Sequence, residues 1–190
     1  MEKQTRGPYK RGIEKKHEIL SVALDLFARQ GFAATSMREI AKASSLTQAG
    51  LLHHFPTKDE LLMTIIVERD ARQGSSIWDP ATWRQQFLKT ARTNQDNRAE
   101  TLLFSSLSAA AEDESHPAHN YMVTRYKKMV RGLSLAIAQE HSRESPVETD
   151  IKTAEMVVAI WDGLQLQWLL SGIDILDSLS KALDLIAPKP

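Results

Sequence analysis

Residues 47–54 combine small side chains with hydrogen-bonding ones over about two turns of a predicted helix. The set is Thr47, Gln48, Ala49, Gly50, His53 and His54. The major groove of DNA admits one α-helix, and base edges there are recognised through hydrogen bonds. Ala49 and Gly50 would let a backbone approach the groove, while the hydroxyl, amide and imidazole groups can contact bases and phosphates. This pattern favours nucleic-acid binding.

Catalytic and metal-binding patterns are missing from the sequence. There is no Cys, no Gly-rich phosphate loop, no His-Glu-x-x-His motif and no Gly-x-Ser-x-Gly motif. His53 and His54 lie about 100° apart on a helix, which is too far to hold one metal together. His116 and His119 can share a helix face but have no evident third ligand. We therefore expect no enzymatic activity, no cofactor and no metal.

The two parts of the chain differ in charge although the formal net charge is +0. Residues 1–58 contain 10 Lys and Arg against 5 Asp and Glu, whereas residues 59–190 contain 14 against 19. The asymmetry predicts an anionic partner for the N-terminal part alone. A basic arm over residues 1–16 contributes Arg6, Lys10, Arg11, Lys15 and Lys16. Such an arm can neutralise phosphates or enter the minor groove, or it can be only a solubilising tail.

The local sequence around residues 47–54 predicts a helix-turn-helix over residues 36–55. Ser36 and Glu39 have the spacing of a capping box, so a short supporting helix follows, and residues 44–46 form the turn. Thr47 caps the recognition helix. Arg38 can reach a base edge or phosphate, with an ion pair to Glu39 as the alternative, and Lys58 is expected to contact a phosphate. The predicted DNA contacts are Arg11, Ser36, Arg38, Thr47, Gln48, Ala49, Gly50, His53, His54 and Lys58.

Helical periodicity continues along the whole chain and predicts an all-α fold of about nine helices. Helices are expected over residues 13–30, 36–43, 47–55 and 57–72 and, after a break near Gly74, over 79–94, 98–112, 116–142, 147–170 and 175–186. Pro80 and Pro117 suit first helical positions, and Ser145 with Glu148 has capping-box spacing. The natural division gives a DNA-binding domain over 1–57 and a second helical domain over 58–190.

The second domain contains an aromatic face that suits a ligand pocket. Trp161, Gln165 and Trp168 share one side of a helix, and a polar group between two tryptophans is typical of a mostly apolar pocket. The alternative is core packing around a satisfied amide. The predicted ligand contacts are Leu62, Ile66, Phe87, Phe104, Tyr126, Trp161, Gln165 and Trp168.

The residues of the N-terminal part also resemble a known family. The stretch 35–61, TSMREIAKASSLTQAGLLHHFPTKDEL, closely resembles the DNA-binding domain of TetR-family transcriptional regulators. The positions in register are Ile40, Ala41, Leu51, His54, Phe55, Lys58 and Leu61, preceded by a first helix with Ile19, Leu20, Ala23, Phe27, Gly31 and Phe32. Two positions differ from the family pattern: Ser45 stands where Gly is common, and Leu52 where Tyr commonly contacts a phosphate. The segment 162–170, DGLQLQWLL, is more weakly similar to a branch that includes choline-responsive repressors.

The resemblance implies a homodimer that binds a two-fold symmetric operator in double-stranded DNA and is released by a small-molecule inducer. The function expected is therefore a ligand-responsive regulator, a repressor, with a non-sensing regulator or activator and an all-α enzyme as alternatives. The expected dimer face combines one side of the 147–170 helix with the last helix; an internal seam is the alternative. Its residues are Met156, Ala159, Gly163, Leu166, Leu170 and Leu179. With no membrane span or signal-peptide pattern, we expect a cytoplasmic protein.

Overall fold

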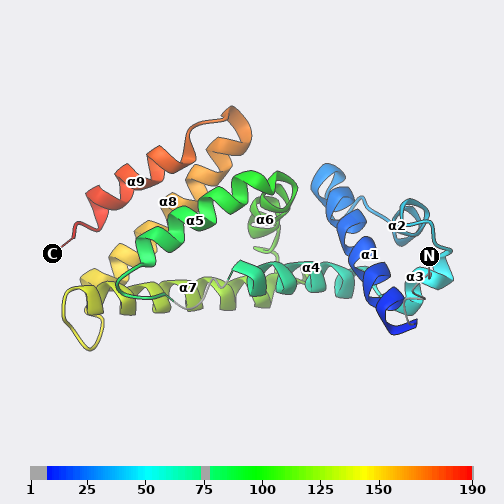
Figure 1. Cartoon of the computed structure of the whole chain (residues 1–190), viewed down its shortest axis with the longest axis horizontal. Coiled ribbons are helices and arrows are strands. Elements are labelled where there is room, and N and C mark those ends of the chain that lie inside the picture. The colour runs from blue at the N-terminus through cyan, green and yellow to red at the C-terminus, as the bar shows by residue number, and fades with distance from the viewer. Residues whose placement is uncertain (1–7, 74–77, 190) are drawn as a thin grey trace, which may run out of the picture. The chain divides into compact units, whose positions relative to one another are not determined.

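The structure is a computed structural model that describes residues 8–73 and 78–189 of the chain. Within these residues every regular element is a helix, which confirms the all-α prediction. The helices (Figure 1) are α1 Pro8–Gln30, α2 Met37–Ala43, α3 Gln48–His54, α4 Lys58–Gln73, α5 Trp83–Asp96, α6 Arg98–Ala110, α7 His119–Glu140, α8 Glu148–Ser171 and α9 Ile175–Ile186. None of these helices is both long enough and apolar enough to cross a membrane.

α1 begins at Pro8 instead of residue 13, and the predicted starts of α5 and α7 are also wrong, each for a local reason, whereas α8 starts within one residue of its prediction but with a different cap. α5 begins at Trp83 because residues 79–82 form a turn, in which the Thr82 N–H donates to the Asp79 carbonyl over 3.0 Å. α7 likewise begins at His119, after a turn in which the His119 N–H donates to the His116 carbonyl. The capping box expected at Ser145 does not form.

The cap of α8 is provided by Asp150 instead. Its carboxylate accepts the Val147 N–H over 2.9 Å and is also paired with Arg143. The Asp150 side chain is buried, so it must satisfy its charge through nearby donors, and the N-terminus of the helix supplies one of them. A buried acidic cap thus replaces the exposed Ser145–Glu148 pair that the sequence pattern favours.

The chain divides into two compact units, Met1–Arg69 and Asp70–Pro190, called here the N-terminal and C-terminal units. The division falls inside α4, so most of this helix packs with the N-terminal unit. A functional boundary at residue 57 stays a prediction.

The N-terminal unit is a small helical assembly in which α2 contacts both α1 and α3 (Figure 1). Its core contains the fully buried Ile19, Ala23, Ile40 and Leu51, together with Phe27 and Phe55. Burying a large aliphatic or aromatic side chain contributes roughly 1.5–3 kcal/mol, so these residues fix the crossing of α1, α2 and α3. Helices as short as α2 and α3 are not stable alone, and their tertiary contacts hold them in place.

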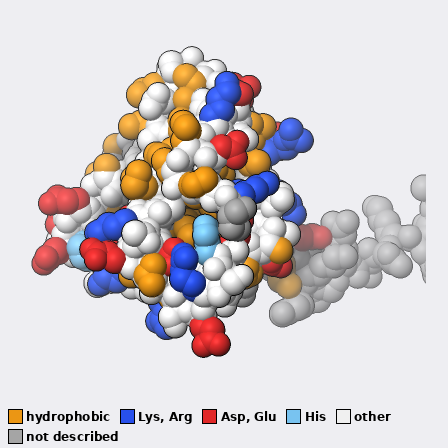
Figure 2. Space-filling view, turned by 90° about the vertical axis from the view of Figure 1, so that its left-hand side faces the viewer, with side chains coloured by type: hydrophobic (Ala, Val, Ile, Leu, Met, Phe, Trp, Pro, Cys, Tyr) orange, Lys and Arg blue, Asp and Glu red, His pale blue; other side chains and the backbone are white. Residues whose placement is uncertain are grey.

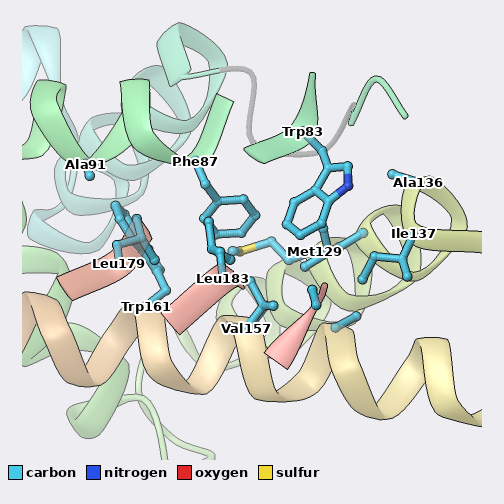
Figure 3. Packing of buried hydrophobic residues seen from close by; sticks show 14 of the residues in the cluster. Trp83, Phe87, Ala91, Met129, Ala136, Ile137, Val157, Trp161, Leu179 and Leu183 are labelled. Carbon is cyan, nitrogen blue, oxygen red and sulfur yellow. The ribbon is translucent and has the colours of Figure 1, made fainter. Parts of the chain in front are cut away.

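The C-terminal unit has an aromatic core formed by α5, α7, α8 and α9. In Figure 3, Trp83 and Phe87 of α5 point toward Met129 of α7, Val157 of α8 and Leu183 of α9. The Trp161 ring meets Phe87 edge-on, with ring centres 5.8 Å apart. Edge-to-face pairs of this kind add about 0.5–1.5 kcal/mol to the burial itself. The four helices therefore form one packed body.

Two helices end in the same motif with serine at a left-handed position. After α2, Ser45 has φ 54°, and the N–H groups of Ser45 and Leu46 donate to the carbonyls of Lys42 and Ala41. After α7, Ser142 has φ 60°, and the Ser142 and Arg143 N–H groups donate to the Gln139 and Ala138 carbonyls. Both are Schellman motifs, whose left-handed residue is usually Gly. The positive φ that the TetR resemblance suggests at residue 45 is thus present without Gly.

We expect Ser45→Gly and Ser142→Gly each to stabilise the protein by about 0.5–1 kcal/mol. A Cβ in the left-handed region costs about 1–2 kcal/mol, part of which is offset because Gly increases the entropy of the unfolded chain. Urea denaturation should show higher midpoints with unchanged slopes. Ser145→Gly is the control, since φ is not positive there, and it should give no gain. Equal effects of all three substitutions would contradict the assignment of strain.

Candidate functional site

The helix-turn-helix expected from the sequence is present in the N-terminal unit. The Ser36 hydroxyl accepts the Glu39 N–H over 3.2 Å, and the Glu39 carboxylate accepts the Ser36 N–H over 2.9 Å. The hydrogen bonds that the Ser36 N–H and then the Ser36 hydroxyl donate to the Glu39 carboxylate hold the pKa of this carboxyl below its ordinary value. Thr47 caps α3 by accepting the Gly50 N–H over 3.1 Å. The caps define where both helices start, and the Ser45 turn sets the path between them.

α3 presents a polar face to solvent and an apolar face to the core. Gln48, Ala49 and His53 are exposed, whereas Leu51 is fully buried and Phe55 almost so. Leu52, which is not among the predicted DNA contacts, is also 39% exposed. It follows Gln48 by four residues, so the two side chains lie on the same side of the helix. An apolar side chain in this position can contact a thymine methyl group.

Gly50 leaves room for the cap of α3 and does not have a left-handed backbone angle. A Cβ added there would lie 3.2 Å from the Thr47 hydroxyl oxygen, which is the atom that caps the helix. A larger residue would have to displace this hydroxyl. Gly50 therefore contributes to the start of α3, and its predicted close approach to DNA stays a prediction.

Lys58 makes several contacts within the N-terminal unit. Its ammonium donates to the carbonyls of Phe32 and Thr35 over 2.7 and 2.9 Å, and it lies 4.3 Å from the centre of the Phe32 ring. These contacts fasten the loop between α1 and α2 to the start of α4. The sequence predicts a phosphate contact for this residue, whereas the geometry gives its ammonium a structural role.

The other basic residues of the unit fall into two groups. Lys15 donates to the Ser44 carbonyl over 2.6 Å, and the Lys16 ammonium lies 5.2 Å from the centre of the Phe55 ring, so both help to pack α1 against the helix-turn-helix. Arg38 is exposed and forms no ion pair with a residue in the described part of the chain, which leaves its guanidinium available. The side chain of Arg11 lies outside the described residues.

The predicted ligand face of α8 is occupied by the protein's own side chains. Trp161 is buried against Phe87, and the Gln165 amide oxygen accepts the Asn94 amide N–H over 2.6 Å in a buried position. The guanidinium of Arg98 lies 5.5 Å from the centre of the half-buried Trp168 ring. This arrangement matches the alternative of core packing around a satisfied amide. Leu62 and Ile66 are also fully buried.

A second group of predicted ligand residues surrounds polar contacts between α6, α7 and α8. The Tyr126 hydroxyl donates to Asp162 over 2.6 Å. Burial, followed by the Asp162 carboxylate, raises the pKa of Tyr126 to about 12. Arg125 lies 5.8 Å from the centres of both the Phe104 and Tyr126 rings, and its Nε donates to Asp70 over 2.9 Å. Arg125 is not among the predicted ligand residues, because no local spacing marks a cation whose partners include residues of α4 and α6.

The predicted dimer residues on α8 lie mostly at the surface. Met156 and Leu166 are each 50% exposed and Leu170 is 78% exposed, while Ala159 is exposed and Gly163 half-buried. Leu179 is different, because it is fully buried in the core of the C-terminal unit and presents no surface to a partner. Helical spacing alone placed Leu179 among the predicted dimer residues. Its side chain lies on the side of α9 that packs into the chain's own core.

Comparison with known proteins identifies the N-terminal helices. Residues 19–65 match the family of bacterial regulatory proteins called the tetR family. The chain is 24% identical to the transcriptional regulator QacR of Staphylococcus aureus over 165 residues, which is 87% of this chain and 79% of QacR. It is 36% identical over 76 residues to RutR of Escherichia coli, covering 40% of this chain and 34% of RutR.

Solved structures match over both units. GusR of Salmonella enterica superposes with a TM-score of 0.71 at 21% identity, covering 97% of this chain and 99% of GusR. The SmeT–triclosan complex gives a TM-score of 0.74 at 16% identity, covering 91% and 90%. At these identities the structures demonstrate the shared fold, while the sequence matches identify the helix-turn-helix. Residues 19–65 therefore form a DNA-binding domain of the tetR family, and the chain is similar over most of its length to a transcriptional regulator of the helix-turn-helix type.

Proposed function

We propose that this chain binds a palindromic operator as a homodimer, represses transcription, and is released from DNA by a small molecule. The observation that carries the proposal is the exposed face of α3, where Gln48 and His53 stand clear of the core within a capped helix-turn-helix. QacR and RutR are both transcriptional regulators. The proposed function of this chain is accordingly to bind DNA and a small molecule, and not to catalyse a reaction.

The DNA contacts proposed are those of α3 with the start of α2. Gln48 projects from the first turn of α3 with an amide that can pair bidentately with adenine. Arg38, exposed at the start of α2, is proposed to reach a phosphate or base edge. Two symmetric copies of α3 in successive major grooves would be about 34–36 Å apart, or somewhat more where the groove is widened.

Gln48→Ala tests the DNA-binding proposal. We expect it to weaken operator binding by about 1–3 kcal/mol and to relax the preference at one base pair, because one bidentate contact is lost. The operator is first located by footprinting the DNA upstream of the chain's own gene, and affinity is then measured by fluorescence anisotropy at fixed salt.

The matched control is Gln85→Ala, which removes an exposed amide from α5, away from both the helix-turn-helix and the proposed dimer face. It should leave operator affinity unchanged. If Gln48→Ala also left affinity and base preference unchanged, α3 would not be the recognition helix.

The homodimer proposal rests on the exposed apolar side of α8. Met156, Ala159, Gly163, Leu166 and Leu170 recur every three or four residues, so they line one side of the helix. Figure 2 shows that hydrophobic side chains also reach the surface among charged ones at the end of the molecule that lies on the left of Figure 1. An isologous contact would cover these residues in both copies.

Release by a small molecule requires that the ligand prefer a conformation that fits the operator poorly. We place this ligand near Phe104, Tyr126 and Arg125, where aromatic rings meet buried polar groups. α4 contains the division between the two units, so a displacement of its C-terminal end is proposed to change the placement of the recognition helices. By reciprocity, operator DNA would weaken ligand binding by the same factor.

A further inference from the structure

A groove of about 540 Å³ runs along the surface between α7 and the beginning of α8. Apolar groups form much of its lining: the ring of Tyr126, Val130, Pro146 and Ile151. Ile151 is 39% exposed although it is a large aliphatic residue. The groove is large enough for a chain or ring system of small-molecule size.

The charged groups at this groove favour an anion. Lys127 and Arg131, four residues apart on α7, both line it, are exposed, and form no ion pair with any residue that the structure describes. The acidic residue in the lining, Glu155, is already paired with Lys152 over 2.9 Å. The Ser134 hydroxyl donates to the Arg131 carbonyl over 3.0 Å, so it is engaged within α7.

The local positive charge contrasts with its surroundings. Residues 59–190 contain 14 Lys and Arg against 19 Asp and Glu, so this part of the chain is acidic as a whole. Two unpaired cations beside an apolar surface would attract a molecule with a negatively charged head and an apolar body. A cationic amphiphile would instead meet like charge at the same place.

We propose that the α7–α8 groove is a binding site for an amphipathic anion, with its carboxylate or similar head between Lys127 and Arg131 and its apolar part along Val130 and Ile151. The site is distinct from the one proposed for the inducer, apart from the Tyr126 ring that both share. Binding is measured without DNA, so a negative result leaves the operator proposal untouched.

Three ten-carbon probes with the same apolar chain test the site: decanoate, decanol and decyltrimethylammonium. We expect decanoate to bind most tightly by isothermal titration calorimetry below its micellar concentration, and added salt to weaken it. Lys127→Gln with Arg131→Gln should weaken decanoate binding by about 20-fold, since an exposed ion pair contributes up to about fivefold. The effect on decanol should be small.

The matched control is Lys89→Gln with Arg92→Gln. This pair removes the same charge from a second surface groove of about 410 Å³ between α5 and α9. It should leave decanoate affinity within about twofold of the original, because the cations at the α7–α8 groove remain. An NMR titration should also shift the Ile151 methyl signal, identified by its loss in Ile151→Val.

Four results would overturn the proposal. The first two are equal affinity for decanoate and decyltrimethylammonium, and unchanged decanoate affinity in the Lys127/Arg131 variant. The other two are equal losses of decanoate affinity in the Lys127/Arg131 and Lys89/Arg92 variants, and no binding of decanoate at all. Light scattering of the Lys127/Arg131 variant adds a further check. A changed oligomeric state would mean that the groove is an interface between two copies of the chain, which also contradicts a ligand site.

Discussion

Gly163→Arg should convert the dimer to monomers and reduce operator affinity by about 10²–10⁴-fold, which is the contribution expected from linking two binding modules. A Cβ at Gly163 meets no atom within 4 Å in the single chain, so the substitution is compatible with the fold of one copy. The neighbouring residues of the same side, Ala159 and Leu166, are exposed. An arginine there would place a desolvated charge at the closest approach of two copies of α8.

The oligomeric state is checked by light scattering and sedimentation, with circular dichroism to confirm that the helices remain. Gly163→Ala is the matched control, because it adds a methyl group in open space and improves helix propensity by about 1 kcal/mol. This control should remain dimeric. An intact dimer in Gly163→Arg would place the interface elsewhere on the C-terminal unit.

Glu140→Ala should destabilise the C-terminal unit by about 3–5 kcal/mol, because it leaves a buried arginine without its anion. The Glu140 carboxylate at the end of α7 accepts the indole N–H of Trp83 over 3.0 Å and is paired with Arg84. Arg84 is buried and also donates to the Ala187 carbonyl after α9. One carboxylate thus helps to hold α5, α7 and the end of α9 together.

The change would be measured by urea denaturation, followed by the fluorescence of the tryptophans in this unit. Glu144→Ala, which removes an exposed carboxylate shortly after α7, is the control and should change stability by less than about 0.5 kcal/mol. Glu140→Gln should have an intermediate effect, since the amide oxygen can still accept the Trp83 indole N–H. If Glu140→Ala and Glu144→Ala were equally stable, the Arg84–Glu140 pair would not contribute to the stability of the C-terminal unit.

The helix-turn-helix could be predicted from the sequence because its signals are local. The Ser36–Glu39 capping box and the Thr47 cap join residues three positions apart, so their spacing already contains the geometry. Gly31 likewise ends α1 with φ 82°. Periodicity also separated the buried Leu51 from the exposed Gln48. The resemblance to the TetR family rests on these same residues.

The tertiary structure decided the features that join distant residues. Asn94 and Gln165 are 71 positions apart, yet their side chains meet in a buried hydrogen bond, so an apparent ligand face became part of the core. Lys58 reaches carbonyls more than 20 positions away, and Leu179 points into the body rather than outward. Helical periodicity gives the direction in which a side chain leaves the axis of its helix, but it does not say which residue of another helix that side chain contacts. That neighbour depends on how the helices pack, and packing determines which polar and apolar groups remain exposed.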